Sequence, residues 1–221
     1  MDQKISKVPA RIAVLPQDHR GFHIPWFVAR LPDGSRDFRF ADPAKKGIAV
    51  RTKKCWVCGG TLGTYFCFVI GPMCAVTRTT AEPPCHQDCA QYSVKICPFL
   101  TKPRMRRNDK DLEEFKKIGA EMPPGFAIMR NPGATCLWTC RDFKTFKVAG
   151  DNSGDFLIRI GEPGRIEWYA EGRPATKTEV LASIDSGFPL LEKEARAQGL
   201  EAVKALQEDR REVEDRYIPK S

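Results

Sequence analysis

Short apolar stretches, separated by glycine and proline, recur along the first 175 positions of this 221-residue chain. They are rich in β-branched and aromatic side chains and have the length of strands in globular proteins. The predicted strands are residues 11–15, 24–28, 37–40, 65–70, 74–79, 126–130, 135–141, 145–148, 156–160 and 166–169. The pattern therefore predicts an N-terminal β region in residues 1–54 and a second antiparallel β region in residues 108–175.

Turn residues between these stretches indicate how neighbouring strands connect. Pro32-Asp-Gly34 has the composition of a hairpin turn, which favours a small antiparallel sheet near the N-terminus. Gly71-Pro-Met73 separates residues 65–70 from residues 74–79. The second turn therefore predicts a β-hairpin in the middle of the chain.

Helical patterns occupy other segments. Residues 85–96 contain neither proline nor glycine and follow two prolines, which suit the first turn of a helix. Residues 109–119 place acids first and bases last, in agreement with the helix dipole. Thr176 and Glu179 have capping-box spacing before a helix expected to end near Gly187, with another helix starting at Pro189. Residues 176–221 are thus predicted to be C-terminal helices.

Two close pairs of metal-ligating residues stand out from this background. Cys55 and Cys58 are two residues apart, with glycines following that permit a tight knuckle. His86 and Cys89 would lie one turn apart on one face of the helix in residues 85–96. Three thiolates and one imidazole can complete a tetrahedron, so the sequence predicts a Zn²⁺ site with these four ligands.

Other cysteines offer alternative ligand sets. Cys85 would point about 100° away from His86 around a helix, and it is the expected substitute if His86 is not used. Cys74 and Cys97 could serve as ligands or as buried apolar residues, whereas Cys67 is expected in the core. Nine cysteines without an export signal favour metal ligation and reduced thiols over a disulfide framework.

Residues 55–98 resemble a treble-clef zinc finger, because a knuckle, a predicted hairpin and a helix carrying the last two ligands follow in that order. The resemblance implies a structural metal in a family that includes nucleic-acid binders, nucleases and protein-interaction modules. The expected fold class is α+β, with antiparallel β regions flanking a treble-clef-like zinc module and a C-terminal helical segment. The module with its basic flanks covers residues 55–107.

Positive charge is concentrated around this module. The chain has 36 basic and 28 acidic residues, a net charge of +8, yet residues 45–107 alone contain 11 basic and only two acidic residues. Such a concentration is typical of proteins that bind polyanions. The candidates for phosphate contacts are Lys53, Lys54, Arg104, Arg106 and Arg107. The alternative is that these residues lie in ordinary solvated loops.

Evidence for catalysis is weak, and no catalytic residue is assigned. An HNH-type nuclease requires a general-base histidine near its hairpin, but residues 62–80 contain no histidine. His19 or His23 would have to supply it from the N-terminal region. The sequence also lacks a Walker loop and a Gly-x-Gly-x-x-Gly fingerprint, which excludes the common nucleotide-dependent enzymes.

The expected location is the cytoplasm, without a membrane contact. No apolar run approaches the roughly 20 residues that span a bilayer, and the first residues lack the apolar stretch of a secretion signal.

Several longer motifs resemble uncharacterised small proteins of bacteria and their phages. They include residues 20–26, 71–74, 82–89, 97–99 and 168–175. This resemblance implies a second hypothesis, in which a phage-encoded protein binds a host protein such as a defence component. Trp168, Tyr169 and Arg173 would suit such an interaction surface, and the alternative is a strand end packed on the following helix. The favoured hypothesis is a zinc-stabilised protein that binds nucleic acid; the oligomeric state is left open.

Overall fold

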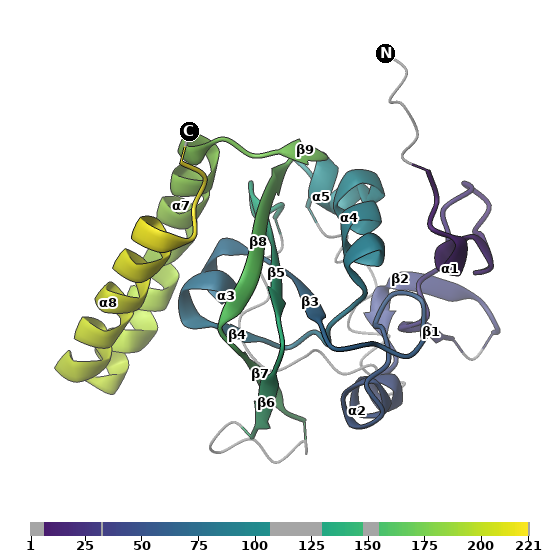
Figure 1. Ribbon diagram of the computed structural model, residues 1–221, viewed down its shortest axis with the longest axis horizontal. Helices are drawn as coiled ribbons and strands as arrows, with labels where there is room; N and C mark the ends of the chain where they lie inside the picture. The colour runs from purple at the N-terminus through teal and green to yellow at the C-terminus, as the bar shows by residue number, and fades with distance from the viewer. Residues whose placement is uncertain (1–6, 32, 107–129, 148–154, 221) are drawn as a thin grey trace.

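A central antiparallel sheet organises the computed structural model, which describes residues 7–31, 33–106, 130–147 and 155–220. Within these residues the sheet has four strands, in the order β3-β5-β8-β9 (Figure 1). The strands are β3 (Phe66–Ile70), β5 (Thr135–Cys140), β8 (Pro163–Ala170) and β9 (Arg173–Pro174). All six residues of β5 are buried, as expected of a strand covered on both faces.

Helices cover the two faces of this sheet. Cys67 pairs with Thr139, and Thr139 pairs with Arg165, so these side chains share one face. Helices α4 (Gln87–Ile96) and α5 (Pro98–Thr101) lie on that side, and the Thr139 hydroxyl donates to Gln87 Oε1 at 2.7 Å. Helices α3 (Pro72–Thr77), α7 (Lys177–Gln198) and α8 (Leu200–Arg216) lie on the other side (Figure 1).

A smaller sheet continues from the end of β5. It has the order β4-β7-β6 and consists of β4 (Thr79–Thr80), β7 (Leu157–Ile160) and β6 (Phe143–Phe146) among the described residues. The Phe143 ring packs edge-on against Phe66 and Phe68, with centroids 5.0 and 5.7 Å apart. These aromatic contacts join the small sheet to β3.

The N-terminal region forms a separate layer beside the metal-ligand knuckle. It comprises α1 (Ala10–Ala13), the strand pair β1 (Val28–Arg30) and β2 (Arg36–Ala41), and α2 (Pro43–Arg51). The Asp42 side chain caps α2 by accepting from the Ala44 N–H at 3.0 Å. Lys46 on α2 is buried, and its ammonium lies 2.5 Å from Asp155, which ties α2 to the chain before β7.

The predicted hairpin in residues 65–79 is wrong. β3 pairs with β5, about 70 residues further along the chain, and Pro72–Thr77 forms the helix α3. Pro72 suits the first turn of a helix, and Ala75 and Val76 bury their side chains in the core. The hairpin on which the treble-clef resemblance partly depended is therefore absent from this segment.

Two further local predictions are corrected. Residues 10–13 are helical rather than extended, and only Ile12 of α1 is buried. Helix α7 runs through Gly187 and Pro189 to Gln198. Gly187 allows close packing on α3, because a Cβ there would lie 2.8 Å from Met73 Sδ. Burial of one continuous stripe on α7 thus outweighs the two helix-breaking residues.

Other predictions are confirmed. The α+β class and the C-terminal helical segment are present, α4 occupies the expected helix, and the capping box of Thr176 and Glu179 is formed. The predicted helix in residues 109–119, and residues 126–129 of a predicted strand, lie outside the described residues. No described helix combines the length and the apolar character needed to cross a membrane.

Ser183 gives a test of how α7 docks on the sheet. Its buried hydroxyl accepts from the Ala134 N–H at 3.1 Å and donates to the Pro132 carbonyl. Ser183→Ala leaves both backbone groups without this partner, so we expect the free energy of unfolding to fall by about 1–3 kcal/mol. Thr178→Ala, at an exposed position of the same helix, should change it by less than about 0.5 kcal/mol. Urea denaturation of the metal-loaded protein measures both, and equal effects would contradict this docking role.

Candidate metal centre

The knuckle that carries Cys55 and Cys58 is shaped by its own backbone. The Cys55 N–H donates to the Gly60 carbonyl at 2.7 Å, and the Gly59 N–H donates to the Cys55 carbonyl at 2.8 Å. Gly59 has a φ of +74°, and a Cβ there would lie 2.7 Å from Trp26 Cγ. Glycine is therefore required at this turn, both for its conformation and for the space that Trp26 occupies.

The second pair of ligands lies at the start of α4. His86 is the N-cap residue, and Cys89 lies within the first turn. Cys85 and Cys67 exchange two backbone hydrogen bonds, of 2.7 and 3.1 Å, which fix the start of α4 beside β3. The Trp56 N–H also donates to the Pro84 carbonyl at 3.0 Å. Backbone pairing thus brings the helix start to the knuckle.

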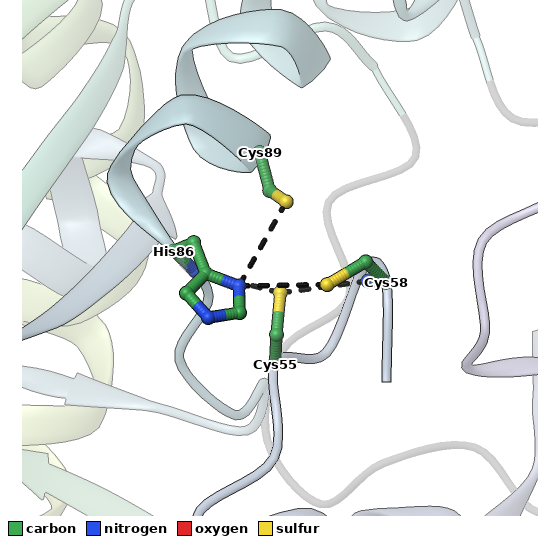
Figure 2. A group of neighbouring side chains, drawn as sticks. All are labelled: Cys55, Cys58, His86 and Cys89. Carbon is green, nitrogen blue, oxygen red and sulfur yellow. Dashed lines mark hydrogen bonds between the residues drawn. The ribbon is translucent and has the colours of Figure 1, made fainter. Parts of the chain in front are cut away.

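The four predicted ligands converge, as Figure 2 shows. The ligand atoms of Cys55, Cys58, His86 and Cys89 all lie within 4.8 Å of one another. His86 Nδ1 is 3.4 Å from Cys58 Sγ and 4.0 Å from Cys89 Sγ. Bonds of about 2.0–2.3 Å to one tetrahedral ion would bring such donors to similar separations. The cluster is compatible with a zinc-finger-like module that holds a metal ion.

Hydrogen bonds around the cluster orient its donors. His86 Nε2 lies 3.0 Å from the Thr61 carbonyl, which can only accept, so Nε2 carries the proton and the Nδ1 lone pair faces the sulfurs. Backbone N–H groups of Cys58 and His86 each lie 3.4 Å from Cys55 Sγ. The Gly60 N–H lies 3.4 Å from Cys58 Sγ. Such donors favour the thiolate of Cys55, whereas the hydrogen bond between the Cys58 thiol and Cys55 outweighs the Gly60 donor and raises the pKa of Cys58.

The sulfurs also influence one another. Hydrogen bonds from the thiols of Cys58, Cys85 and Cys89 hold the pKa of Cys55 well below its ordinary value. The same contacts, with Cys55 and then Cys58, raise the pKa of Cys89. Protons are therefore shared unequally around Cys55, and a cation that binds all four donors must displace those that remain.

The alternative ligands occupy other places. Cys85 is buried beside Cys55, and its thiol donates to the Cys55 sulfur from outside the four-ligand cluster. Cys74 is half-buried against the edge of the core, and burial of its thiol raises its pKa to about 12. Cys97 follows the last residue of α4, at the opposite end of that helix from His86. Among the described residues, the four-ligand group is Cys55, Cys58, His86 and Cys89.

The predicted phosphate contacts fall into two groups. Lys53 lies in the turn before the knuckle, and its ammonium is 5.8 Å from the Phe66 ring centroid, near the last residue of β5. Lys54 precedes the knuckle and forms an isolated backbone β-bridge with Thr61, which follows it. Arg104 is exposed. Arg106 forms an isolated backbone β-bridge with Arg130, which precedes β5. The two groups thus lie towards opposite ends of β5, a strand about 17 Å long. Arg107 lies outside the described residues.

Two other lysines of the basic segment have structural partners. Lys45 donates to the Trp26 carbonyl at 2.7 Å, and Lys46 pairs with Asp155. Sequence reasoning also missed two exposed residues at the same end of β3 as Lys53, namely Tyr65 and Arg141. Tyr65 is 55% exposed, and Arg141 Nη2 donates to its hydroxyl at 3.2 Å. The sequence shows an aromatic residue directly before the apolar run 66–70. Its exposure and its contact with Arg141 depend on the pairing of β3 with β5.

The remaining candidate residues have local contacts. His23 lies within hydrogen-bond distance of Gln17 and Tyr92, at 3.1 and 3.4 Å.

Trp168 is buried and donates to the Tyr217 carbonyl at 2.8 Å, and Tyr169 is buried too. Arg173 pairs with Glu179 at the start of α7. These contacts agree with a strand end packed on the C-terminal helices rather than an exposed binding surface.

No protein-family model, no curated protein and no solved structure matches this chain. The metal-ligand cluster and the fold around it therefore carry the functional argument.

Metal analysis with single substitutions tests the ligand set. We expect about one metal ion per purified chain, and Cys58→Ser should lower the metal content because it removes one thiolate. Cys97→Ser and Cys74→Ser should leave the content unchanged. Elemental analysis together with titration of free thiols measures both quantities. Loss of the metal from Cys97→Ser, or full retention by Cys58→Ser, would contradict the assignment.

The imidazole position allows a second test. His86→Cys replaces one suitable donor by another and should retain the metal, whereas His86→Ala should weaken metal binding at least tenfold. Competition with a chromophoric chelator measures the affinity of each variant. Equal affinity of His86→Ala and the unchanged protein would exclude His86 as a ligand.

Proposed function

We propose that this is a zinc-stabilised binding protein that contacts nucleic acid. Three cysteines and one histidine are the donors typical of structural Zn²⁺, and four protein ligands leave no open position for a catalytic water. The ion's role would be to join the knuckle to α4. The order of knuckle and ligand helix is that of treble-clef fingers, with β3 and α3 in place of the hairpin.

Exposed cations at one end of the central sheet carry the proposal. Several basic side chains elsewhere pair with carboxylates, as Lys46 does with Asp155, Arg78 with Glu212 and Arg210 with Asp185. Lys53 and Arg141 instead contact aromatic rings, those of Phe66 and Tyr65. A polyanion can therefore approach these cations without displacing a carboxylate. We name Lys53, Tyr65 and Arg141 the Tyr65 surface.

A metal ion at the four-ligand cluster would support the position of Lys53. Lys53 has a φ of +50°, a conformation that costs energy for a residue other than glycine. Its carbonyl accepts from the Leu62 N–H at 2.7 Å. This hydrogen bond joins the chain before Cys55 to the chain after Cys58. A metal ion that holds the knuckle would thereby hold this lysine at the surface.

Salt-dependent binding tests the proposal. Lys53→Asn combined with Arg141→Gln should weaken binding to single-stranded and duplex DNA alike, and should reduce the slope of log affinity against log salt by about 1.4–1.8. Asparagine tolerates the left-handed conformation at position 53, so the backbone should be preserved. Fluorescence anisotropy at several salt concentrations measures both quantities.

Two comparison variants sharpen this test. Lys177→Gln combined with Lys204→Gln removes the same charge from exposed positions of α7 and α8, and should leave the slope unchanged. Arg104→Gln combined with Arg106→Gln tests the group at the other end of β5. Absence of binding to either DNA at low salt would refute the proposal and favour a protein partner.

A further inference from the structure

The aromatic member of the Tyr65 surface is exposed far more than a packing role requires. Tyr65 is 55% exposed, whereas its neighbour Phe66 is 5% exposed and packs against Phe143. The exposed ring forgoes the free energy of burial and leaves part of its surface accessible to a ligand. Arg141 contacts the Tyr65 ring, and Lys53 lies over the ring of the adjacent Phe66.

Arg141 contacts both the ring and the hydroxyl of Tyr65. Its guanidinium carbon lies 5.4 Å from the ring centroid, and Nη2 donates to the phenol oxygen at 3.2 Å. Both contacts restrain the side chain before any ligand arrives, so less conformational freedom is lost on binding. The ring is therefore oriented in advance, with more than half of the residue's surface accessible to solvent.

A restrained, exposed aromatic ring beside an arginine suits an unpaired base. Bases stack on aromatic side chains with little dependence on sequence, while lysine and arginine contact the adjacent phosphates. In a duplex the faces of the bases are already stacked on one another, and exposing one costs a few kcal/mol. The protruding ring can thus contribute to binding of a single strand but not to binding of an undistorted duplex.

We infer that the Tyr65 surface binds single-stranded nucleic acid, with one base stacked on Tyr65 and its flanking phosphates near Lys53 and Arg141. This inference rests on the proposed nucleic-acid binding and specifies the form of the ligand. Lys53 and Arg141 supply the salt-dependent part of the affinity. Tyr65 supplies the part of the affinity that favours a single strand over a duplex.

The test uses the full-length, metal-loaded protein and three variants at position 65. The probes are a labelled single-stranded oligothymidine and a labelled hairpin duplex with the same number of phosphates. Tyr65→Ala should lose about 5- to 150-fold in affinity for the single strand, the range expected for one stacked base. Its affinity for the duplex and its salt slope should not change.

Matched variants separate stacking from packing. Tyr65→Phe keeps the ring and should retain most of the single-strand affinity, whereas Tyr65→Leu keeps apolar bulk without a stacking face and should resemble Tyr65→Ala. Metal content and thermal unfolding establish that each variant is folded, as expected for an exposed position.

The outcomes distinguish this inference from the function on which it rests. Equal affinity of the unchanged protein for the two probes, or full single-strand affinity in Tyr65→Leu and Tyr65→Ala, overturns the inference and leaves nucleic-acid binding in place. Failure to bind either probe at low salt overturns both. Preferential binding of the single strand that is lost with the ring and restored by Tyr65→Phe supports it.

Discussion

Four ligand atoms from two distant parts of the chain lie within 4.8 Å of one another, and a metal ion bound there would join the knuckle that carries Cys55 and Cys58 to the start of α4. Thiolates placed so close repel one another unless a cation lies between them. A structural Zn²⁺ contributes about 10–16 kcal/mol of apparent binding free energy in small modules, which exceeds the whole stability of many domains. Here that free energy would stabilise a turn containing Gly59 and Lys53, both with positive φ.

The ligand pairs were predictable from the sequence because each is a local feature. Two residues separate Cys55 from Cys58, and one helical turn separates His86 from Cys89, so spacing alone indicates the geometry within each pair. The contacts that bring the two pairs together cannot be predicted from the spacing of the ligands. The two hydrogen bonds between Cys67 and Cys85 position α4 beside β3, and nothing in the spacing of these cysteines indicates that pairing.

The errors in predicting the fold have the same origin. Residues 65–70 form a strand as expected, but their partner is β5 rather than the adjacent segment, because strand pairing is decided by burial across the whole sheet. Once β3 pairs with β5, residues 72–77 are free to cover the sheet as α3. Similarly, Gly187 and Pro189 do not end α7, because Val180, Ile184 and Phe188 bury one continuous face. Tertiary contacts outweighed local propensity in both segments.

Charge alone also gave an incomplete picture of the surface. Lys45 and Lys46 contribute to the basic excess in the sequence, yet both donate to partners within the fold. Arg141 lies outside the basic segment but reaches Tyr65 through the pairing of β3 with β5. A surface that binds a polyanion is therefore defined by which cations lack a carboxylate partner, and that depends on the fold.

β3 links the candidate metal site to the Tyr65 surface. Cys67 on this strand bonds through its backbone to Cys85 at the metal-ligand helix and pairs with Thr139 of β5 on its other side. Tyr65 directly precedes the same strand, and Lys53 lies over its first ring, that of Phe66. The strand is short and almost entirely buried, so close packing restrains its backbone along its whole length. A metal ion that orders the knuckle and α4 would in this way order the exposed ring as well, although none of its ligands belongs to the surface.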